Sequence, residues 1–274
     1  MVQLERIIEQ FKIETKIPSI KLTAIRSENI PVTGSKLGGK PYFPKNLEYP
    51  KNPDGVPLKL LAQLNFAELP KLENFPDKGI LQFYILSNDM MGLGFDNLAE
   101  QRDFRVLYHE ELLPLEMLQS DFSAFEENQD EEVIFPFDGE FILTGEMINH
   151  AMPPDDYRFN KLFNALCEKL GYEKRLGYES NYDEEFNEMV WDRFSNEYSL
   201  ISGYPNFTQT DPRQYGKDLK KYDTLLFQLE SQHNKQIKNW DILWGDAGVG
   251  NFFINLEDLK NCKFDDILYT WDCG

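Results

Sequence analysis

The sequence predicts a mainly β protein of the α+β class, in which an internally duplicated β-unit forms a roll-like sheet core with a few peripheral helices. Two observations support this prediction. Short apolar segments bounded by Gly, Pro, Asn and Asp recur along most of the chain, as in proteins built from short strands and turns. Four sequence blocks also reappear in the same order in the second half, which is typical of a repeated structural unit.

Three segments carry the helical period, because their apolar residues recur three and four positions apart. Pro18 ends the first helix, Gly171 is placed to end the second, and the acidic run 183–185 complements the N-terminus of the third. The apolar faces are Leu4, Ile7, Ile8 and Phe11 in the first helix, Phe159, Leu162, Phe163, Leu166 and Leu170 in the second, and Phe186, Met189, Val190 and Phe194 in the third.

Strands are predicted for most of the remaining chain. Apolar and polar residues alternate across 20–24 and again across Trp240–Trp244, which indicates half-buried strands. The acidic stretch Glu126–Glu132 is predicted to be an exposed loop. The clearest other strands are Leu58–Phe66, Ile80–Leu86, Phe104–His109, Glu140–Thr144, Thr224–Glu230, Asn251–Ile254 and Asp266–Tyr269.

The repeat predicts how these strands are organised. Its four blocks have offsets of 164, 165, 169 and 161 residues when first-half numbers are subtracted from second-half numbers. One unit alone has too little core to be stable, so we expect a single domain over 1–274. It comprises β-units at about 19–110 and 200–273, an N-terminal helix at about 3–13 and a strand-plus-helix insert at about 133–200. The paired blocks are Gly39–Phe43 with Gly203–Phe207, Leu60–Leu64 with Leu225–Leu229, Asp77–Ile85 with Asp246–Ile254, and Val106–Tyr108 with Ile267–Tyr269.

Composition excludes several classes of partner. The 28 basic and 47 acidic residues give a formal net charge of -19, whereas nucleic-acid binding and attraction to anionic membranes both depend on clustered cations. The N-terminus has no signal peptide, and no apolar stretch is long enough to span a membrane. The three cysteines form no CxxC pair, which fits reduced thiols. We therefore expect a cytoplasmic protein that binds neither nucleic acid nor membrane.

Gln63 and Gln228 occupy equivalent places on the mixed faces of the two Leu-Leu-x-Gln-Leu strands. The interpretation we favour is that each amide ties a neighbouring loop to the sheet, since most side-chain hydrogen bonds go to backbone or water. The alternative is that the two side chains converge and line a ligand pocket.

Asp246 lies between Trp244 and two glycines, which resembles the setting of a catalytic carboxylate. Its counterpart Asp77 stands in the equivalent turn of the first unit, so a turn role explains both residues. Each turn ends in glycine, Gly79 in the first and Gly248 in the second, where a positive φ is expected.

Motifs for catalysis or cofactor binding are missing from the sequence. The stretch 34–40 matches GxxxxGK, but Pro41 replaces the Ser or Thr that holds magnesium and prevents a helix, so the stretch is interpreted as a tight turn. The three histidines are far apart, and the acidic pair Asp155-Asp156 is interpreted as helix-start or solvated acids. There is no GxSxG motif. We predict no catalytic residue, metal or cofactor.

Several motifs together resemble the YwqG-like family of bacterial proteins, a domain of unknown function. The resemblance covers about 35–273 and implies a mainly β, duplicated, roll-like fold in a cytosolic bacterial protein; it supplies no activity or catalytic residue. An association of some members with secreted-toxin genes suggests partner binding. The matching segments are 38–44, 61–64, 75–84, 203–205, 226–229 and 244–248.

We therefore expect a non-catalytic binding protein for an unknown protein partner, whose acidic surface would steer a basic partner such as a toxin domain. The alternative is a small-ligand binder or enzyme with its site in the groove between the two β-units, lined by Gln63, Gln228, Trp244 and Asp246.

Overall fold

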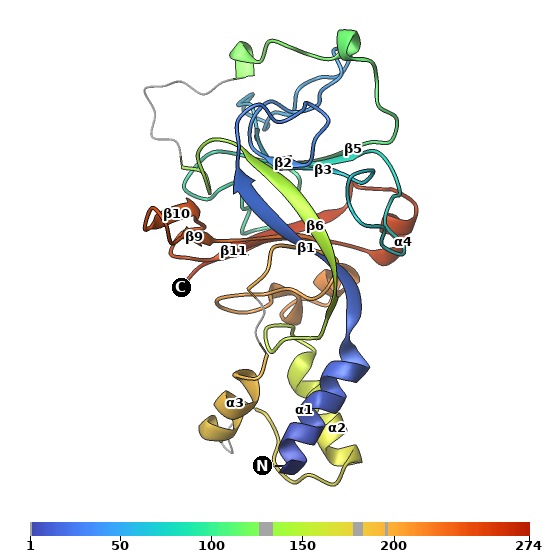
Figure 1. Ribbon diagram of the computed structural model, residues 1–274, viewed down its shortest axis with the longest axis vertical. Helices are drawn as coiled ribbons and strands as arrows, with labels where there is room; N and C mark the ends of the chain where they lie inside the picture. Colours follow the sequence, from blue (N-terminus) through green and yellow to red (C-terminus); the bar gives the residue numbers. More distant parts are fainter. Residues whose placement is uncertain (1, 126–133, 178–182, 195–196) are drawn as a thin grey trace.

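The computed structural model describes residues 2–125, 134–177, 183–194 and 197–274. Its centre is a ten-stranded antiparallel sheet that curls into a nearly closed barrel, accompanied in these ranges by four α-helices (Figure 1). The prediction of a mainly β protein with a few helices is therefore confirmed. The acidic stretch Glu126–Glu132, predicted to be an exposed loop, lies outside the described residues.

From one edge to the other, the sheet runs β12-β11-β8-β7-β1-β6-β2-β3-β4-β5. Two further strands, β9 and β10, form a separate two-stranded sheet. The bounds are β1 Ile17–Arg26, β2 Lys36–Leu37, β3 Lys59–Asn65, β4 Ile80–Ile85, β5 Phe104–His109, β6 Phe141–His150, β7 Leu200–Ile201, β8 Thr224–Glu230, β9 Gln232–Asn234, β10 Asn239–Ile242, β11 Val249–Ile254 and β12 Ile267–Asp272.

The long pair β1 and β6 crosses the middle of the sheet, from Ile17 opposite His150 to Arg26 opposite Phe141. On one side of it lie β2, β3, β4 and β5, and on the other β7, β8, β11 and β12, in matching order. This order is the one that two copies of a single unit would produce. The duplication itself stays a prediction.

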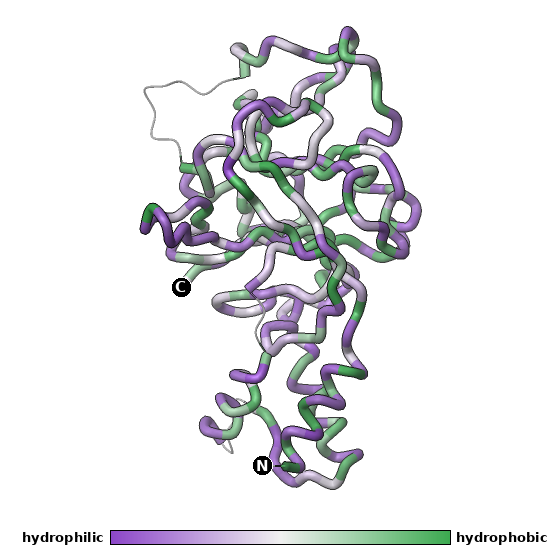
Figure 2. Tube along the Cα trace, viewed as in Figure 1, coloured by the Kyte–Doolittle hydropathy of each residue, from purple (hydrophilic) through white to green (hydrophobic). Residues whose placement is uncertain are grey.

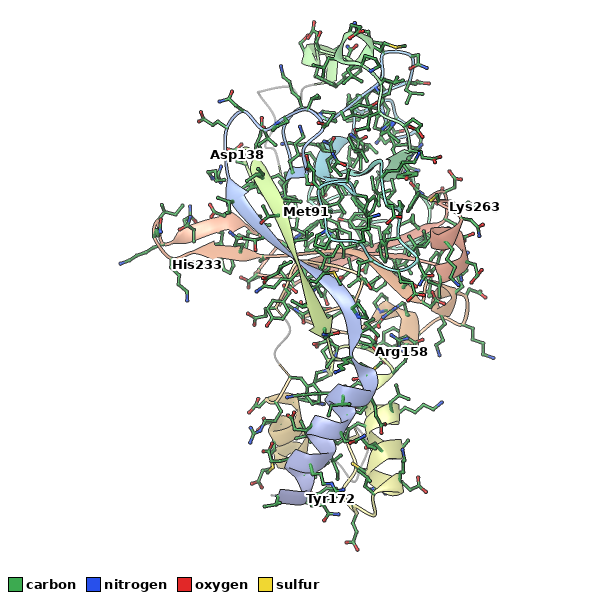
Figure 3. The ribbon with its side chains drawn as sticks, turned by 45° about the vertical axis from the view of Figure 1, so that its right-hand side comes forward. Met91, Asp138, Arg158, Tyr172, His233 and Lys263 are labelled. Atoms are coloured by element: carbon green, nitrogen blue, oxygen red, sulfur yellow. The ribbon has the colours of Figure 1, made fainter. Side chains whose placement is uncertain are left out.

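The core fills the barrel between its two sides. Phe83 of β4 contacts Phe227 of β8, with ring centroids 4.8 Å apart. Near the open seam, Phe104 of β5 contacts Tyr269 of β12 at 5.2 Å. The Tyr269 hydroxyl also donates to the carbonyl oxygen of Met91 at 2.7 Å, and Figure 3 shows Met91 near the middle of the molecule. Burial of these aromatic side chains joins both sides of the sheet into one core.

Three helices, α1 Val2–Thr15, α2 Phe159–Lys169 and α3 Glu184–Trp191, gather at one end of the molecule (Figure 1). Polar and apolar residues alternate along them, as Figure 2 shows. Their apolar faces meet around Phe11, whose ring lies 5.0 Å from that of Phe159. Asp183 accepts the Phe186 N–H at 3.0 Å and caps α3. No described helix combines the length and apolarity that crossing a membrane requires.

Buried ion pairs lie where the helical end meets the barrel. Arg158, labelled there in Figure 3, binds Asp156 through two N–H groups at 2.7 and 2.6 Å. Asp156 also lies 3.5 Å from Arg213, which in turn holds Asp211 at 2.7 Å. Asp156 does accept the Arg158 N–H at the start of α2, but its side chain is fully buried. The interpretation of Asp156 as a solvated acid is therefore wrong, because the carboxylate is buried and its charge is compensated by the neighbouring Arg158 and by Arg213 from a distant part of the chain.

Candidate functional site

Gln63 on β3 is fully buried, and its amide binds only protein groups. Its Oε1 accepts the Tyr42 N–H at 2.8 Å, as well as a hydrogen bond from Gln82. Its Nε2 donates to the carbonyl oxygens of Val32 at 2.9 Å and Gly34 at 2.8 Å. Gln63 therefore fixes the chain on both sides of β2 to the sheet, which is the loop-tying role that we favoured.

Gln228 on β8 makes the corresponding bonds in the second half. Its Oε1 accepts the Asn206 N–H at 2.8 Å, and its Nε2 donates to the carbonyl oxygen of Tyr198 at 2.7 Å. Among the described residues, no hydrogen bond joins Gln228 to Gln63. The prediction that the two glutamines line a ligand pocket stays a prediction.

Trp244 and Asp246 have different surroundings. Trp244 is fully buried and lies over Gly250 of β11, where an added Cβ would be 2.5 Å from the indole ring. Asp246 is exposed in the turn that precedes β11. The positive φ predicted for Gly79 is confirmed at 83°, but the one predicted for Gly248 is wrong. Ala247 takes the left-handed conformation instead, with a φ of 65°. Gly248 lies directly against β12, where an added Cβ would be 1.7 Å from the Asp272 carbonyl oxygen.

A groove of about 480 Å³ opens on the first half of the chain, between the segments on either side of β2 and the segment around the short 3₁₀ helix Leu115–Met117. Its volume is in the range of small-molecule sites. Its apolar wall comprises Ile30, Val32, Leu115, Leu118 and Phe122. Its polar and charged groups are Asn29, Lys36, Lys40, Gln119, Ser120 and Glu140. None of the four residues that the sequence proposed for a ligand site lines it.

Lys36 is the most unusual of these residues, because its side chain is only 1% exposed. Its Nζ donates a short hydrogen bond to the carbonyl oxygen of Lys40. Burial lowers the pKa of the Lys36 ammonium from 10.5 to about 8, although the nearby Glu140 carboxylate acts in the opposite direction. Among the described residues Lys36 forms no ion pair, so two of its three N–H donors lack a protein acceptor.

Glu140 enters the groove from the residue before β6. Its carboxylate lies over Gly39, where an added Cβ would be only 2.6 Å from Oε2. Gly38 and Gly39 both have a positive φ, of 64° and 68°, so the expected tight turn is present. This turn brings the backbone against Gly139 and Glu140 and leaves room for the carboxylate beside the lysines.

The register of the sheet shows what stands opposite each glutamine. Lys36 of β2 pairs with Gln63, and Leu200 of β7 pairs with Gln228. Leu200 is fully buried in an apolar cluster. Gln63 thus pairs with a buried lysine, whereas Gln228 pairs with a buried aliphatic residue.

The second half has its own cluster of shifted acids. Burial raises the pKa of Glu230 to about 8 and that of Asp155 to about 6. Asp272, whose pKa is also raised by burial, adds to the repulsion felt by both. Within the described ranges, no group of three or more His, Cys, Asp or Glu side chains is arranged to hold a metal ion.

A family model described as Domain of unknown function (DUF1963) matches residues 35–273. The chain belongs to this DUF1963 family. The comparison with curated proteins found no match. The DUF1963 match begins at Ser35, so it contains Lys36, Lys40, Gln119 and Glu140 of the groove, whereas Asn29, Ile30 and Val32 precede it.

Sequence reasoning missed the groove and its lysine. Lys36 lies within the GxxxxGK-like stretch, which predicts a tight turn because Pro41 excludes a nucleotide site. One signal was available: the repeat aligns Lys36 with the apolar Leu200, at the same offset of 164 as the glycines of the first block. A lysine that the repeat aligns with a core residue is unusual, because lysine is almost never fully buried unless it is paired.

Proposed function

We propose that the protein is a non-catalytic binding protein that holds a small molecule in the groove beside Lys36. The observation that carries this proposal is a buried lysine with unused donors in the wall of a cavity of metabolite size. A buried cation costs free energy unless an acceptor compensates it. A bound molecule that brings acceptors to Lys36 would supply that compensation.

We further propose that the chain arose by internal duplication, as the YwqG-like resemblance implies. Matched hydrogen bonds support this. The Ser35 and Ser199 hydroxyls each accept a backbone N–H from the neighbouring strand, at 3.0 Å in both cases. Gln82 and Asn251, which the repeat aligns, donate to the backbone of Tyr42 and Asn206, the residues whose N–H groups bind the two glutamines.

The proposed duplication distinguishes residues that hold the scaffold together from residues that form a binding site. Groups present in both units, such as Gln63 and Gln228, are explained by the bonds that hold the scaffold. Lys36 has no counterpart, since Leu200 occupies the equivalent position, and so the scaffold does not explain it. We therefore assign binding to the first unit, and not to a groove between the two units.

A thermal-shift screen against metabolites tests the proposal, because a ligand specific to the folded state raises the Tm. Ser120→Trp places a bulky ring on an exposed residue of the groove wall and should abolish the shift of any true groove ligand. Lys260→Trp, on the short helix α4 Leu256–Lys260, is the control and should leave the shift intact. A screen in which no compound raises the wild-type Tm, or in which Ser120→Trp leaves every shift unchanged, contradicts the proposal.

A protein partner remains our second proposal, supported by exposed apolar side chains beside the groove. Leu115 is 70% exposed, Met117 48% and Leu112 40%, all on one segment. Together with the net charge of -19, they suit a partner that is basic around an apolar centre, such as a toxin domain. Capture of a stoichiometric basic protein that is lost on Leu115→Glu supports this proposal. Equal capture by the variant contradicts it.

A further inference from the structure

The Lys36 groove presents charges of both signs, and within the described ranges neither Lys36 nor Glu140 forms an ion pair. Lys36 contributes an ammonium with two unused donors, and Lys40 adds a second, exposed cation. Glu140 contributes a carboxylate that, within the described part of the chain, makes no hydrogen bond or ion pair. It influences Lys36 only through its charge. The groove therefore offers an anion-binding end and a cation-binding end.

The rest of the lining is apolar. Val32, Leu118 and Phe122 form a wall next to the charged groups, and the latter two are buried. The wall is held in place from behind, since Gln63 binds the Val32 carbonyl oxygen. An occupant that satisfies the whole groove has a carboxylate, an ammonium and an apolar body.

We infer that the groove binds a free amino acid with an apolar side chain, its carboxylate on Lys36 and Lys40, its ammonium on Glu140 and its side chain against Val32, Leu118 and Phe122. This inference rests on the proposed small-molecule function and names its ligand class. A zwitterion neutralises both ends of the groove at once. A phosphate or simple carboxylate leaves the Glu140 charge uncompensated and is repelled by it.

Matched ligands test this inference. Isothermal titration calorimetry with valine, leucine, isoleucine, methionine, phenylalanine and tryptophan identifies the tightest binder. That amino acid is then compared with its deaminated acid and its decarboxylated amine, for leucine 4-methylpentanoate and isoamylamine. Because each charge-assisted hydrogen bond contributes strongly, we expect either fragment to bind at least about tenfold more weakly.

Variants test which residue binds the carboxylate of the amino acid and which binds its ammonium. Lys36→Met should weaken binding of the amino acid by about tenfold or more, while binding of the amine changes little. Glu140→Gln should weaken binding of the amino acid by a similar factor. Binding of the deaminated acid should stay unchanged or become tighter. Lys260→Met and Glu257→Gln, an exposed pair on α4, are the matched controls and should change nothing. If Lys36→Met does not fold, Glu140→Gln and the fragment comparison still decide.

The outcomes separate this inference from the proposed function. If no amino acid binds, or if the fragments bind as tightly as the parent, the inference is overturned. Should other metabolites still raise the Tm in a manner that Ser120→Trp abolishes, the small-molecule function stands with a different ligand. Absence of any groove-dependent ligand overturns both.

Discussion

At Gln63 a single buried amide holds three backbone groups, the Tyr42 N–H and the carbonyl oxygens of Val32 and Gly34. Truncation to alanine leaves those groups without their side-chain partner in a largely buried site. We expect Gln63→Ala to reduce the free energy of unfolding by about 1–3 kcal/mol, and Gln228→Ala to do the same. Urea unfolding monitored by circular dichroism measures both.

The exposed Gln236 provides the control for this prediction. Gln236→Ala should remain within about 0.5 kcal/mol of wild type, as surface substitutions usually do. Unfolding curves of Gln63→Ala that superimpose on wild type would contradict the scaffold role and favour a role in binding.

Sequence reasoning reached the role of Gln63 but not that of Lys36, for a physical reason. A polar residue inside an apolar strand must find local partners, so its role follows from the strand pattern. Lysine is almost always exposed, and one that follows Gly-Ser in a turn-rich stretch gives no local sign of burial. Its burial follows from tertiary packing, because β2 pairs with β3 on one side and β6 on the other and the chain after β2 brings the Lys40 carbonyl oxygen to its Nζ.

At the scale of elements, strands β5 and β8 begin and end at the residues predicted, because their apolar segments are flanked by clear turns. The two-residue strands β2 and β7 were not predicted, since two residues cannot show an alternation. Strand β6 extends to His150, well past the predicted end at Thr144. Its second half, 145–150, mixes polar and apolar residues that are mostly exposed or half-buried, and pairing with β1 alone extends it.

Strand β11 packs closely against the Trp244 ring because residue 250 is glycine. A Cβ at Gly250 would lie 2.5 Å from the indole ring, and that ring is fully buried. We expect Gly250→Ala to cost about 1–3 kcal/mol of unfolding free energy through overpacking. Gly177→Ala is the matched control, because an added Cβ there meets nothing within 4 Å. Chemical denaturation of the two variants should differ clearly, and equal stabilities would contradict the packing account.

For the molecule as a whole, the excess of acids has an uneven effect on stability. Most of the described carboxylates are exposed. At Glu230, burial, opposed by a hydrogen bond from Asn206, raises the pKa from 4.5 to about 8. Glu197, Asp155 and Asp272 act in the same direction as burial. Between these two pKa values the folded chain therefore keeps a proton at Glu230 that the unfolded chain has lost.

This difference fixes the sign of the pH dependence. Between pH 4.5 and 8 the folded state binds more protons at Glu230 than the unfolded state, so its contribution to stability falls as the pH rises. Asp155 also makes stability fall with rising pH, between pH 3.8 and about 6. His109 has the opposite effect between about pH 4 and 6.5, because burial lowers its pKa from 6.5 to about 4. From pH 6.5 to about 7.5 Glu230 dominates, whereas nearer pH 8 Lys36, whose pKa burial lowers from 10.5 to about 8, opposes it. Urea unfolding should show stability decreasing from pH 6.5 to about 7.5, and Glu230→Gln should flatten the decrease while the exposed Glu257→Gln retains it. A wild-type stability that rises across this window, or a decrease that persists in Glu230→Gln, would show that Glu230 is ionised in the folded protein.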